Sequence, residues 1–304
     1  MSQFRIMRSM IKTSATSILL LLLVLLQTQA TPKYTPTAFK VEIIGKGSPI
    51  ILIPGLSCSG DVWQETVDRY KKNHELHVLT LAGFAGQPAI KADNFLETVR
   101  LDLAKYIREN NIKKPMVIGH SLGGFLGIWL SAKEPDLIGS LVVVDAAPFL
   151  PALISPVATP ETMKPMAAQM RQGILSQTPE QLRQSQPQVL KMMISDEARI
   201  AQALEWNLAS DAPTVAKAMY ELYTTDLRPE MANIKTPAMF VAAWVAYKDY
   251  GTTHETTKAN YTAQLAKLPN YELVINDKAK HFIMWDDQEG FFSALDGFMA
   301  KTGK

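Results

Sequence analysis

A serine stands between two glycines in the segment Gly119-His120-Ser121-Leu122-Gly123. The apolar run PMVIG before the serine predicts a strand, and SLGGFLGIWLSAK after it predicts a helix. A side chain on such a turn stands clear of both elements, and the helix N-terminus offers unpaired amides to a developing negative charge. A serine hydroxyl is a poor nucleophile by itself, so the segment predicts chemistry only if a base reaches it.

Histidine is the expected base, and the chain has five histidines. His120 adjoins Ser121 in sequence and is expected to pack beside it rather than turn back onto it. His74 and His77 lie at the entrance of a predicted strand, whereas such sheets place their chemistry at the carboxyl ends of strands. His281 differs because it lies just after the last predicted strand and before the last predicted helix.

Apolar runs alternate with amphipathic segments on both sides of a long interruption. Continuous apolar runs indicate strands that are buried on both faces, which predicts an α/β fold with a mostly parallel sheet and helices on each side. From about residue 149 to 233 no strand-like run appears, and EARIAQALEWNLAS and TVAKAMYELYTT have helical periodicity. We therefore expect one core formed by residues 31–148 and 234–304, with 149–233 inserted as a helical cap.

The Ser121 segment and its flanks resemble the nucleophile elbow of the α/β-hydrolase fold family, and the likeness covers nearly all of the chain after residue 31. This resemblance implies that Ser121 is the nucleophile and that His281, in NDKAKHFIMWDDQEG, is the catalytic base. The loop IPGLSCSGDVW resembles the family's second oxyanion loop. The resemblance therefore implies an oxyanion hole made by the backbone amides of Leu56 and Leu122.

The acid of the triad has two candidates. The family usually places it after the strand that follows the insertion, where the first carboxylate of this chain is Asp249, our first choice. In a common form of this loop in the family, a glycine follows the strand directly and an aspartate comes soon after. Here Ala243 and Trp244 stand in place of the glycine, and the loop is longer by a few residues. The alternative is Asp145 in VVVDAAP, because some members take the acid from that earlier strand. Three other carboxylates are expected at the surface: Glu255, Asp286 and Asp287.

The resemblance implies a serine hydrolase that forms an acyl-enzyme and needs no metal or organic cofactor. Ester, thioester and lactone hydrolysis, carbon-carbon bond hydrolysis and proline-releasing peptidase activity all stay open, and so does a non-catalytic ligand-binding role. Seven methionines between residues 163 and 231, with Trp206, Tyr220 and Tyr223, suggest a small-molecule substrate with an apolar acyl or aryl part. The same residues could instead be core residues that join the cap to the sheet.

The N-terminus has the features of a secretory signal peptide. Arg5, Arg8 and Lys12 precede the apolar run ILLLLLVLL, and the small-residue site at Ala30 predicts cleavage after residue 30. Of the 31 basic residues, 28 remain after cleavage against 29 acidic ones, so the mature charge of −1 gives no indication of nucleic-acid binding. We expect an exported protein, periplasmic or extracellular, without a stable membrane span after cleavage.

Overall fold

The computed structural model describes residues 33–303. The chain divides into an N-terminal unit, of which only residues 33–35 are described and contain no helix or strand, and a unit from Pro36 onward that holds the elements named below. The predicted signal peptide, residues 1–30, lies outside the described residues.

The strands are, in chain order, β1 (Phe39–Gly45), β2 (Ser48–Ile53), β3 (His74–Leu81), β4 (Met116–His120), β5 (Ser140–Val144), β6 (Ala238–Ala243) and β7 (Tyr271–Asn276). They form one sheet in the order β1-β3-β2-β4-β5-β6-β7. β1 pairs with β3 in antiparallel fashion, and the other neighbouring pairs are parallel. Every residue of β4 and β5 is buried, as expected for strands covered on both faces. The predicted mostly parallel sheet is confirmed.

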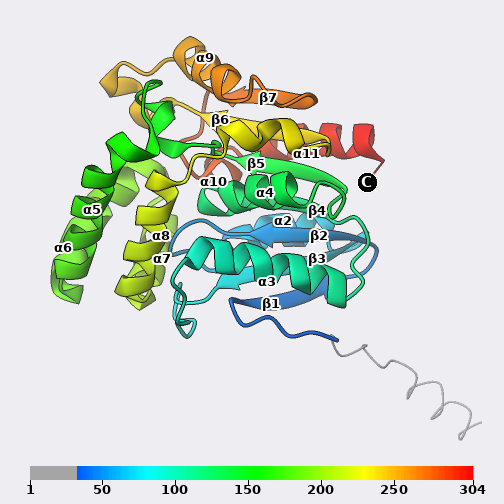
Figure 1. Cartoon of the computed structure of the whole chain (residues 1–304), viewed down its shortest axis with the longest axis horizontal. Coiled ribbons are helices and arrows are strands. Elements are labelled where there is room, and N and C mark those ends of the chain that lie inside the picture. Colours follow the sequence, from blue (N-terminus) through cyan, green and yellow to red (C-terminus); the bar gives the residue numbers. More distant parts are fainter. Residues whose placement is uncertain (1–32, 304) are drawn as a thin grey trace, which may run out of the picture. The chain divides into compact units, whose positions relative to one another are not determined.

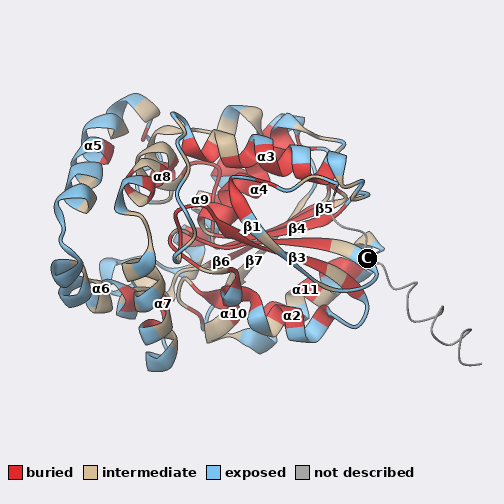
Figure 2. Ribbon diagram, turned by 90° about the horizontal axis from the view of Figure 1, so that it is seen from below, coloured by how far each residue is buried: buried red, intermediate tan, exposed pale blue. Residues whose placement is uncertain are grey.

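The helices that alternate with these strands are α2 (Gln64–Tyr70), α3 (Phe95–Glu109), α4 (Leu122–Lys133), α9 (His254–Gln264), α10 (Ile283–Asp286) and α11 (Gln288–Thr302). α3, α4 and α9 cover one face of the sheet, and α2 and α11 cover the other (Figure 2). Successive side chains of a strand point to opposite faces, so Ile50 and Leu52 of β2 join one core cluster with Trp63 and Phe291. The predicted α/β fold class is confirmed.

The segment between β5 and β6, residues 149–233, contains helices and no strand. Its elements are the short 3-10 helices η2 (Leu150–Leu153) and η3 (Arg228–Asn233) and the helices α5 (Pro160–Ser176), α6 (Pro179–Met193), α7 (Glu197–Ala209) and α8 (Ala212–Thr224). α7 and α8 coincide with the two stretches that have helical periodicity. The segment starts at the carboxyl end of β5, and Figure 1 shows its helices at one end of the sheet. We refer to residues 149–233 as the cap.

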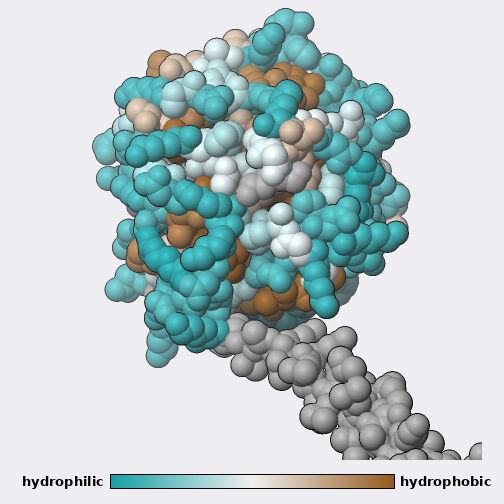
Figure 3. Space-filling view, turned by 90° about the vertical axis from the view of Figure 1, so that its right-hand side faces the viewer, coloured by the Kyte–Doolittle hydropathy of each residue, from teal (hydrophilic) through white to brown (hydrophobic). Residues whose placement is uncertain are grey.

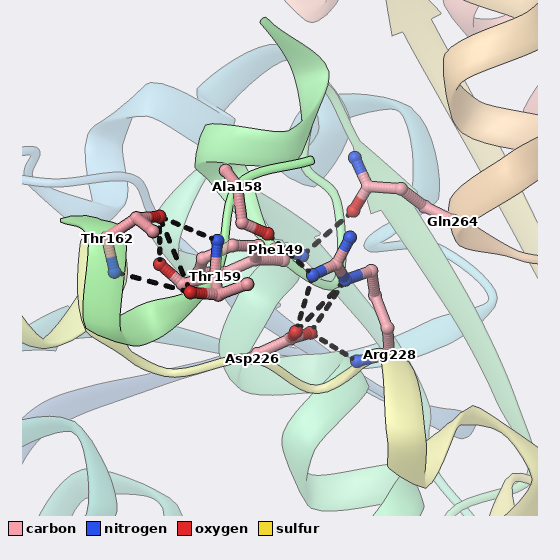
Figure 4. Close-up of polar contacts among 7 residues, drawn as sticks. All are labelled: Phe149, Ala158, Thr159, Thr162, Asp226, Arg228 and Gln264. Atoms are coloured by element: carbon pink, nitrogen blue, oxygen red, sulfur yellow. Dashed lines mark hydrogen bonds and ion pairs between the residues drawn. The ribbon is translucent and has the colours of Figure 1, made fainter. Parts of the chain in front are cut away.

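The two ends of the cap meet at the guanidinium of Arg228. This group pairs with Asp226, with Nη2 to Oδ2 at 2.7 Å, and donates to the Ala158 carbonyl at 3.0 Å. It also lies 4.8 Å from the ring centroid of Phe149, whose amide donates to Gln264 Oε1 at 3.0 Å (Figure 4). The outgoing and returning chain segments are thereby joined to each other and to α9.

The end of the sheet opposite the cap carries the C-terminal end of α11 (Figure 1). Figure 3 looks onto this end, where most of the surface is hydrophilic and the hydrophobic areas are separate from one another. Across residues 33–303, no helix combines the length and the apolar character that crossing a bilayer requires.

Candidate active site

Ser121 joins β4 to α4 with an unusual backbone conformation. Its φ of 52° and ψ of −120° lie outside the regions that most residues adopt, and such strain persists only where surrounding contacts hold it. The Ser121 amide donates to Val144 O at 2.9 Å, and Phe125 N donates to Ser121 O at 3.0 Å. Ser121 is partly exposed, whereas His120 and Leu122 are buried. The turn therefore presents the serine rather than its neighbours.

The glycines on either side of this turn allow backbone segments to approach closely. A Cβ at Gly119 would clash with the carbonyl of Gly123, and a Cβ at Gly123 would clash with the carbonyl of Ile53. The start of α4 thus packs against the loop after β2. A Cβ built on Gly55 would lie 3.3 Å from Ser121 Cβ, which places this loop beside the serine.

The expected oxyanion amides, those of Leu56 and Leu122, belong to these two adjoining segments. Leu122 is the first residue of α4, so its amide has no partner within the helix. Leu56 follows Gly55 in a turn that is closed by the hydrogen bond from Cys58 N to Gly55 O at 3.2 Å. Neither amide donates a hydrogen bond to any other residue in the range 33–303. Both amides thus lack a partner within the described residues, as an oxyanion hole requires.

His281 lies between β7 and α10 and bonds to a carboxylate. Its Nδ1 is 2.6 Å from Asp145 Oδ2, and the other carboxylate oxygen, Oδ1, accepts a hydrogen bond from Ala243 N at 2.9 Å. Asp145 follows β5 with a φ of 47°, and its own amide donates to Val241 O at 2.8 Å. The side chains of Asp145 and His281 are only 10% and 18% exposed, so bulk water weakens this pair little.

Asp249, the first choice for the acid, is not the carboxylate that contacts His281. It lies in the short 3-10 helix η4 (Val245–Tyr250) and is exposed. β6 ends at Ala243, and the chain after it folds into this short helix. The positive φ of Asp145, on the neighbouring strand β5, instead accompanies a carboxylate that reaches His281. The structure thus brings His281 together with the alternative candidate.

His120 packs against His281 and Phe282, in agreement with the packing role expected for it. Its ring centroid is 4.6 Å from those of both His281 and Phe282, and its Nε2 lies 3.1 Å from the His281 carbonyl oxygen. Burial, together with the positive charge that His281 can carry, holds the pKa of His120 well below its usual value. The neutral ring therefore donates its Nε2 proton to the backbone of His281.

Two tyrosines near Asp145 were not singled out by the sequence. Burial and then the charge of Asp145 raise the pKa of Tyr261 in α9 well above its usual value. The same two causes, with a contribution from Tyr223, raise the pKa of Tyr247. Both hydroxyls therefore stay protonated at neutral pH. A tyrosine within a helix carries no motif, so no sequence signal points to these residues.

The methionines of the cap occupy different environments. Met231 is fully buried, Met163 packs against the small cluster around Phe149, and Met193 packs against the main core cluster. Met166, by contrast, is 52% exposed. These four methionines do not form one apolar lining, and the buried ones serve as core residues.

Metal-binding and thiol chemistry find no support among the described residues. Residues 33–303 contain no group of three or more histidine, cysteine, aspartate or glutamate side chains that could hold a metal ion. Cys58 is buried, and burial raises its pKa to about 12. Its thiol is therefore protonated and a poor nucleophile at neutral pH.

A family model described as the alpha/beta hydrolase fold matches residues 48–297. Among curated relatives, a pimeloyl-(acyl-carrier protein) methyl ester esterase of Aeromonas hydrophila is 25% identical over 267 residues, which cover 85% of this chain and 98% of the relative. An N-formylmaleamate deformylase of Pseudomonas putida is 23% identical over 258 residues, covering 84% and 90%.

The fold also matches solved structures. An enol-lactonase from Burkholderia xenovorans superimposes with a TM-score of 0.69 at 19% identity, covering 86% of this chain and 96% of the lactonase. An esterase from Exiguobacterium antarcticum gives a TM-score of 0.70 at 15% identity, covering 86% and 95%. At these identities the likeness concerns the fold alone.

Proposed function

The chain belongs to the α/β-hydrolase fold family and is a hydrolase, and from this premise we propose that it cleaves an ester or related acyl bond with a triad of Ser121, His281 and Asp145. The observation that carries the proposal is the 2.6 Å contact between His281 Nδ1 and Asp145 Oδ2. The proton on Nδ1 points to the carboxylate, so the lone pair of the ring lies on Nε2. A base is thus available opposite the carboxylate.

In the first half-reaction, Ser121 Oγ attacks the carbonyl carbon of the substrate while its proton passes to His281 Nε2. The electron pair of the carbonyl moves onto its oxygen, where the amides of Leu56 and Leu122 stabilise the negative charge. Collapse of this intermediate breaks the bond to the leaving group, which takes the proton from His281. The acyl group remains on Ser121, and Asp145 stabilises the transient imidazolium.

In the second half-reaction, water attacks the acyl-enzyme and gives one proton to His281 Nε2. A tetrahedral oxyanion forms again at the same two amides. Its collapse breaks the bond to Ser121 Oγ, which recovers the proton from His281 as the carboxylic acid leaves. Each group returns to its starting state, and the bond cleavage uses one water molecule.

The choice of bond draws on the relatives as well as the site. The Aeromonas hydrophila relative is a methyl ester esterase and the Pseudomonas putida relative is a deformylase, so both names describe removal of a group from a carbonyl carbon. We therefore place carboxylic esters first among the substrate classes.

The test is hydrolysis of p-nitrophenyl esters from acetate to dodecanoate by the protein without residues 1–30. Ser121→Ala should reduce kcat by about 10⁴-fold or more, and Asp145→Asn by about 10³-fold to 10⁴-fold. Asp249→Asn is the matched control, because this exposed carboxylate should leave kcat within about 2-fold of wild type. Equal residual activity in the two aspartate variants would contradict the triad. A folded but inert wild type would favour ligand binding without turnover.

Export is a second part of the proposal, because residues 1–30 have the charge and apolar pattern of a signal peptide. Expression of the full chain in a Gram-negative host should yield a mature protein that starts at Thr31 and is recovered outside the cytoplasm. Intact-mass measurement of each cell fraction checks this. Full-length protein confined to the cytoplasm would contradict it.

A further inference from the structure

The segment that carries His281 is bonded directly to the junction between two cap helices. We define the histidine loop as Lys280–Asp286 and the α6–α7 junction as Lys191–Ser195. Lys280 Nζ donates to Lys191 O at 2.6 Å and to Ile194 O at 3.2 Å, carbonyls at the C-terminal end of α6. A cation is favourable there because the last carbonyls of a helix are unpaired and carry partial negative charge.

Asp286 joins the same two segments from the other side. Its Oδ1 accepts from Ser195 N at 3.0 Å, and its Oδ2 accepts from Ser195 Oγ and from Lys280 N, each at 3.0 Å. The carboxylate, which was expected at the surface, is partly exposed and accepts three hydrogen bonds, and hydrogen bonds to a charged acceptor are the stronger kind. One side chain therefore links the residue before His281 to the cap.

The residue after His281 is held as well. Phe282 N donates to Met193 O at 3.3 Å, and the Phe282 ring stacks on Trp285 with centroids 4.9 Å apart. Trp285 in turn lies 5.9 Å from Trp206 of α7 and 5.0 Å from the guanidinium carbon of Arg199. Thus the neighbours of His281 on both sides depend on the cap, while its ring bonds to the core.

We propose that Asp286 is a positioning residue for His281: by binding Ser195 and Lys280 together, it lets the α6–α7 junction set the place of the base. This inference rests on the proposed function, in which His281 must lie within hydrogen-bond reach of Ser121. A displacement of about 1 Å at a reacting group can cost about 100-fold in rate. Asp286 has no chemical step of its own.

The experiment combines a kinetic readout with one that does not need turnover. Kinetics use p-nitrophenyl butyrate, and proton NMR records the Nδ1 proton of His281, identified by its loss in Asp145→Asn. In Asp286→Ala, that proton should broaden or disappear, and kcat should fall about 10-fold or more while KM changes less than about 3-fold. Ser195→Ala should change the Nδ1 proton signal and kcat in the same direction as Asp286→Ala but to a smaller extent. Ser195→Thr, which keeps the hydroxyl group, should have a wild-type signal and kcat. Glu289→Ala, an exposed carboxylate of the next helix, should match wild type.

Ser195→Ala keeps Asp286 and the bond from Ser195 N, so it covers the case in which Asp286→Ala fails to fold. Folded variants with a wild-type Nδ1 proton signal and wild-type kcat would overturn the positioning role. An equal response in Glu289→Ala would also overturn it, because the effect would then be general. If wild type hydrolyses no ester but the NMR signal responds as expected, the positioning role stands and the proposed function fails.

Discussion

The inner and outer helices of the cap differ in how they are attached. The inner helices, α7 and α8, reach the α/β core through polar contacts. Glu221 of α8 accepts hydrogen bonds from the amides of Phe95 and Leu96, at 2.8 and 2.7 Å, at the start of α3. After α7, Ser210 Oγ accepts from Ala85 N at 2.9 Å.

The outer helices, α5 and α6, pack chiefly on the inner ones, α5 on α8 and α6 on α7. Each buries a single residue, Ala167 in α5 and Leu190 in α6, and each has a proline within it, Pro165 and Pro187. Only the C-terminal end of α6 meets the histidine loop. We therefore expect substitutions in the inner helices to reduce the stability of the protein more than substitutions in the outer helices.

Among substitutions in the inner helices, the largest loss of stability should come from replacing Glu221. Glu221→Ala leaves two amides of α3 without their charged acceptor, and we expect a loss of about 3 kcal/mol in the free energy of unfolding. Urea denaturation measures this loss. The matched variant Glu161→Ala, at the exposed start of α5, should cost less than about 1 kcal/mol. Similar losses in both variants would remove the distinction between inner and outer helices.

A second test addresses Arg228, where the two ends of the cap meet. Arg228→Met removes the partner of Asp226 and the donor to Ala158 O, so we expect a loss of about 2 kcal/mol in the free energy of unfolding. Arg171→Met, at an exposed position of α5, should change it by less than about 0.5 kcal/mol. Differential scanning calorimetry of both variants decides. A stable Arg228→Met variant would mean that the ends of the cap do not depend on this ion pair.

Local patterns predicted the core strands and the strand-turn-helix around Ser121 well. β4 and β5 were predicted as strands because both of their faces are buried, and the turn at Ser121 was predicted because its motif lies within one short segment. α5 and α6 gave no clear helical pattern, because exposed helices need few apolar residues and the internal prolines obscure the periodicity.

The polar contacts of His281 and of the loop that carries it were harder to predict because they depend on the fold. Asp145 and Asp249 follow neighbouring strands, and the turn conformation that brings one of them to His281 is not evident in the residue types. Asp286 looked like a surface carboxylate because its partner Ser195 lies 91 positions away in the chain. Contacts of this kind require the tertiary structure.

Between pH 6.5 and 5.5, acid should destabilise the core rather than the cap, because histidine is the side chain that titrates in this range and the cap contains none. Burial lowers the pKa of both His120 and His77 in the folded chain, with His281 adding to the effect at His120. Unfolded histidines take up protons near pH 6.5, whereas these two take up protons only at lower pH, so their contribution to stability is present above pH 6.5 and falls below it. Each should contribute a loss of up to about 1 kcal/mol per pH unit between pH 6.5 and 5.5.

Urea denaturation at several pH values checks this slope. His77→Gln, which keeps a polar group opposite Tyr106 Oη, should reduce the slope by at most about half of what the two histidines contribute. A slope that is unchanged in His77→Gln would assign the acid sensitivity to other groups.

The smallest effect should come from a glycine in the outer layer. Gly173 lies within α5, and a Cβ built there has no atom within 4 Å. Gly173→Ala should therefore raise the free energy of unfolding by about 0.5 to 1 kcal/mol, because alanine loses less backbone entropy in a helix. At Gly124 of α4, a Cβ would lie 2.8 Å from Ala146 Cβ and 3.0 Å from Gly119 O, so Gly124→Ala should instead destabilise by about 1 to 3 kcal/mol. If Gly173→Ala also destabilised the protein, position 173 of α5 would have no room for a methyl group, and the outer helices would be packed as tightly as the core.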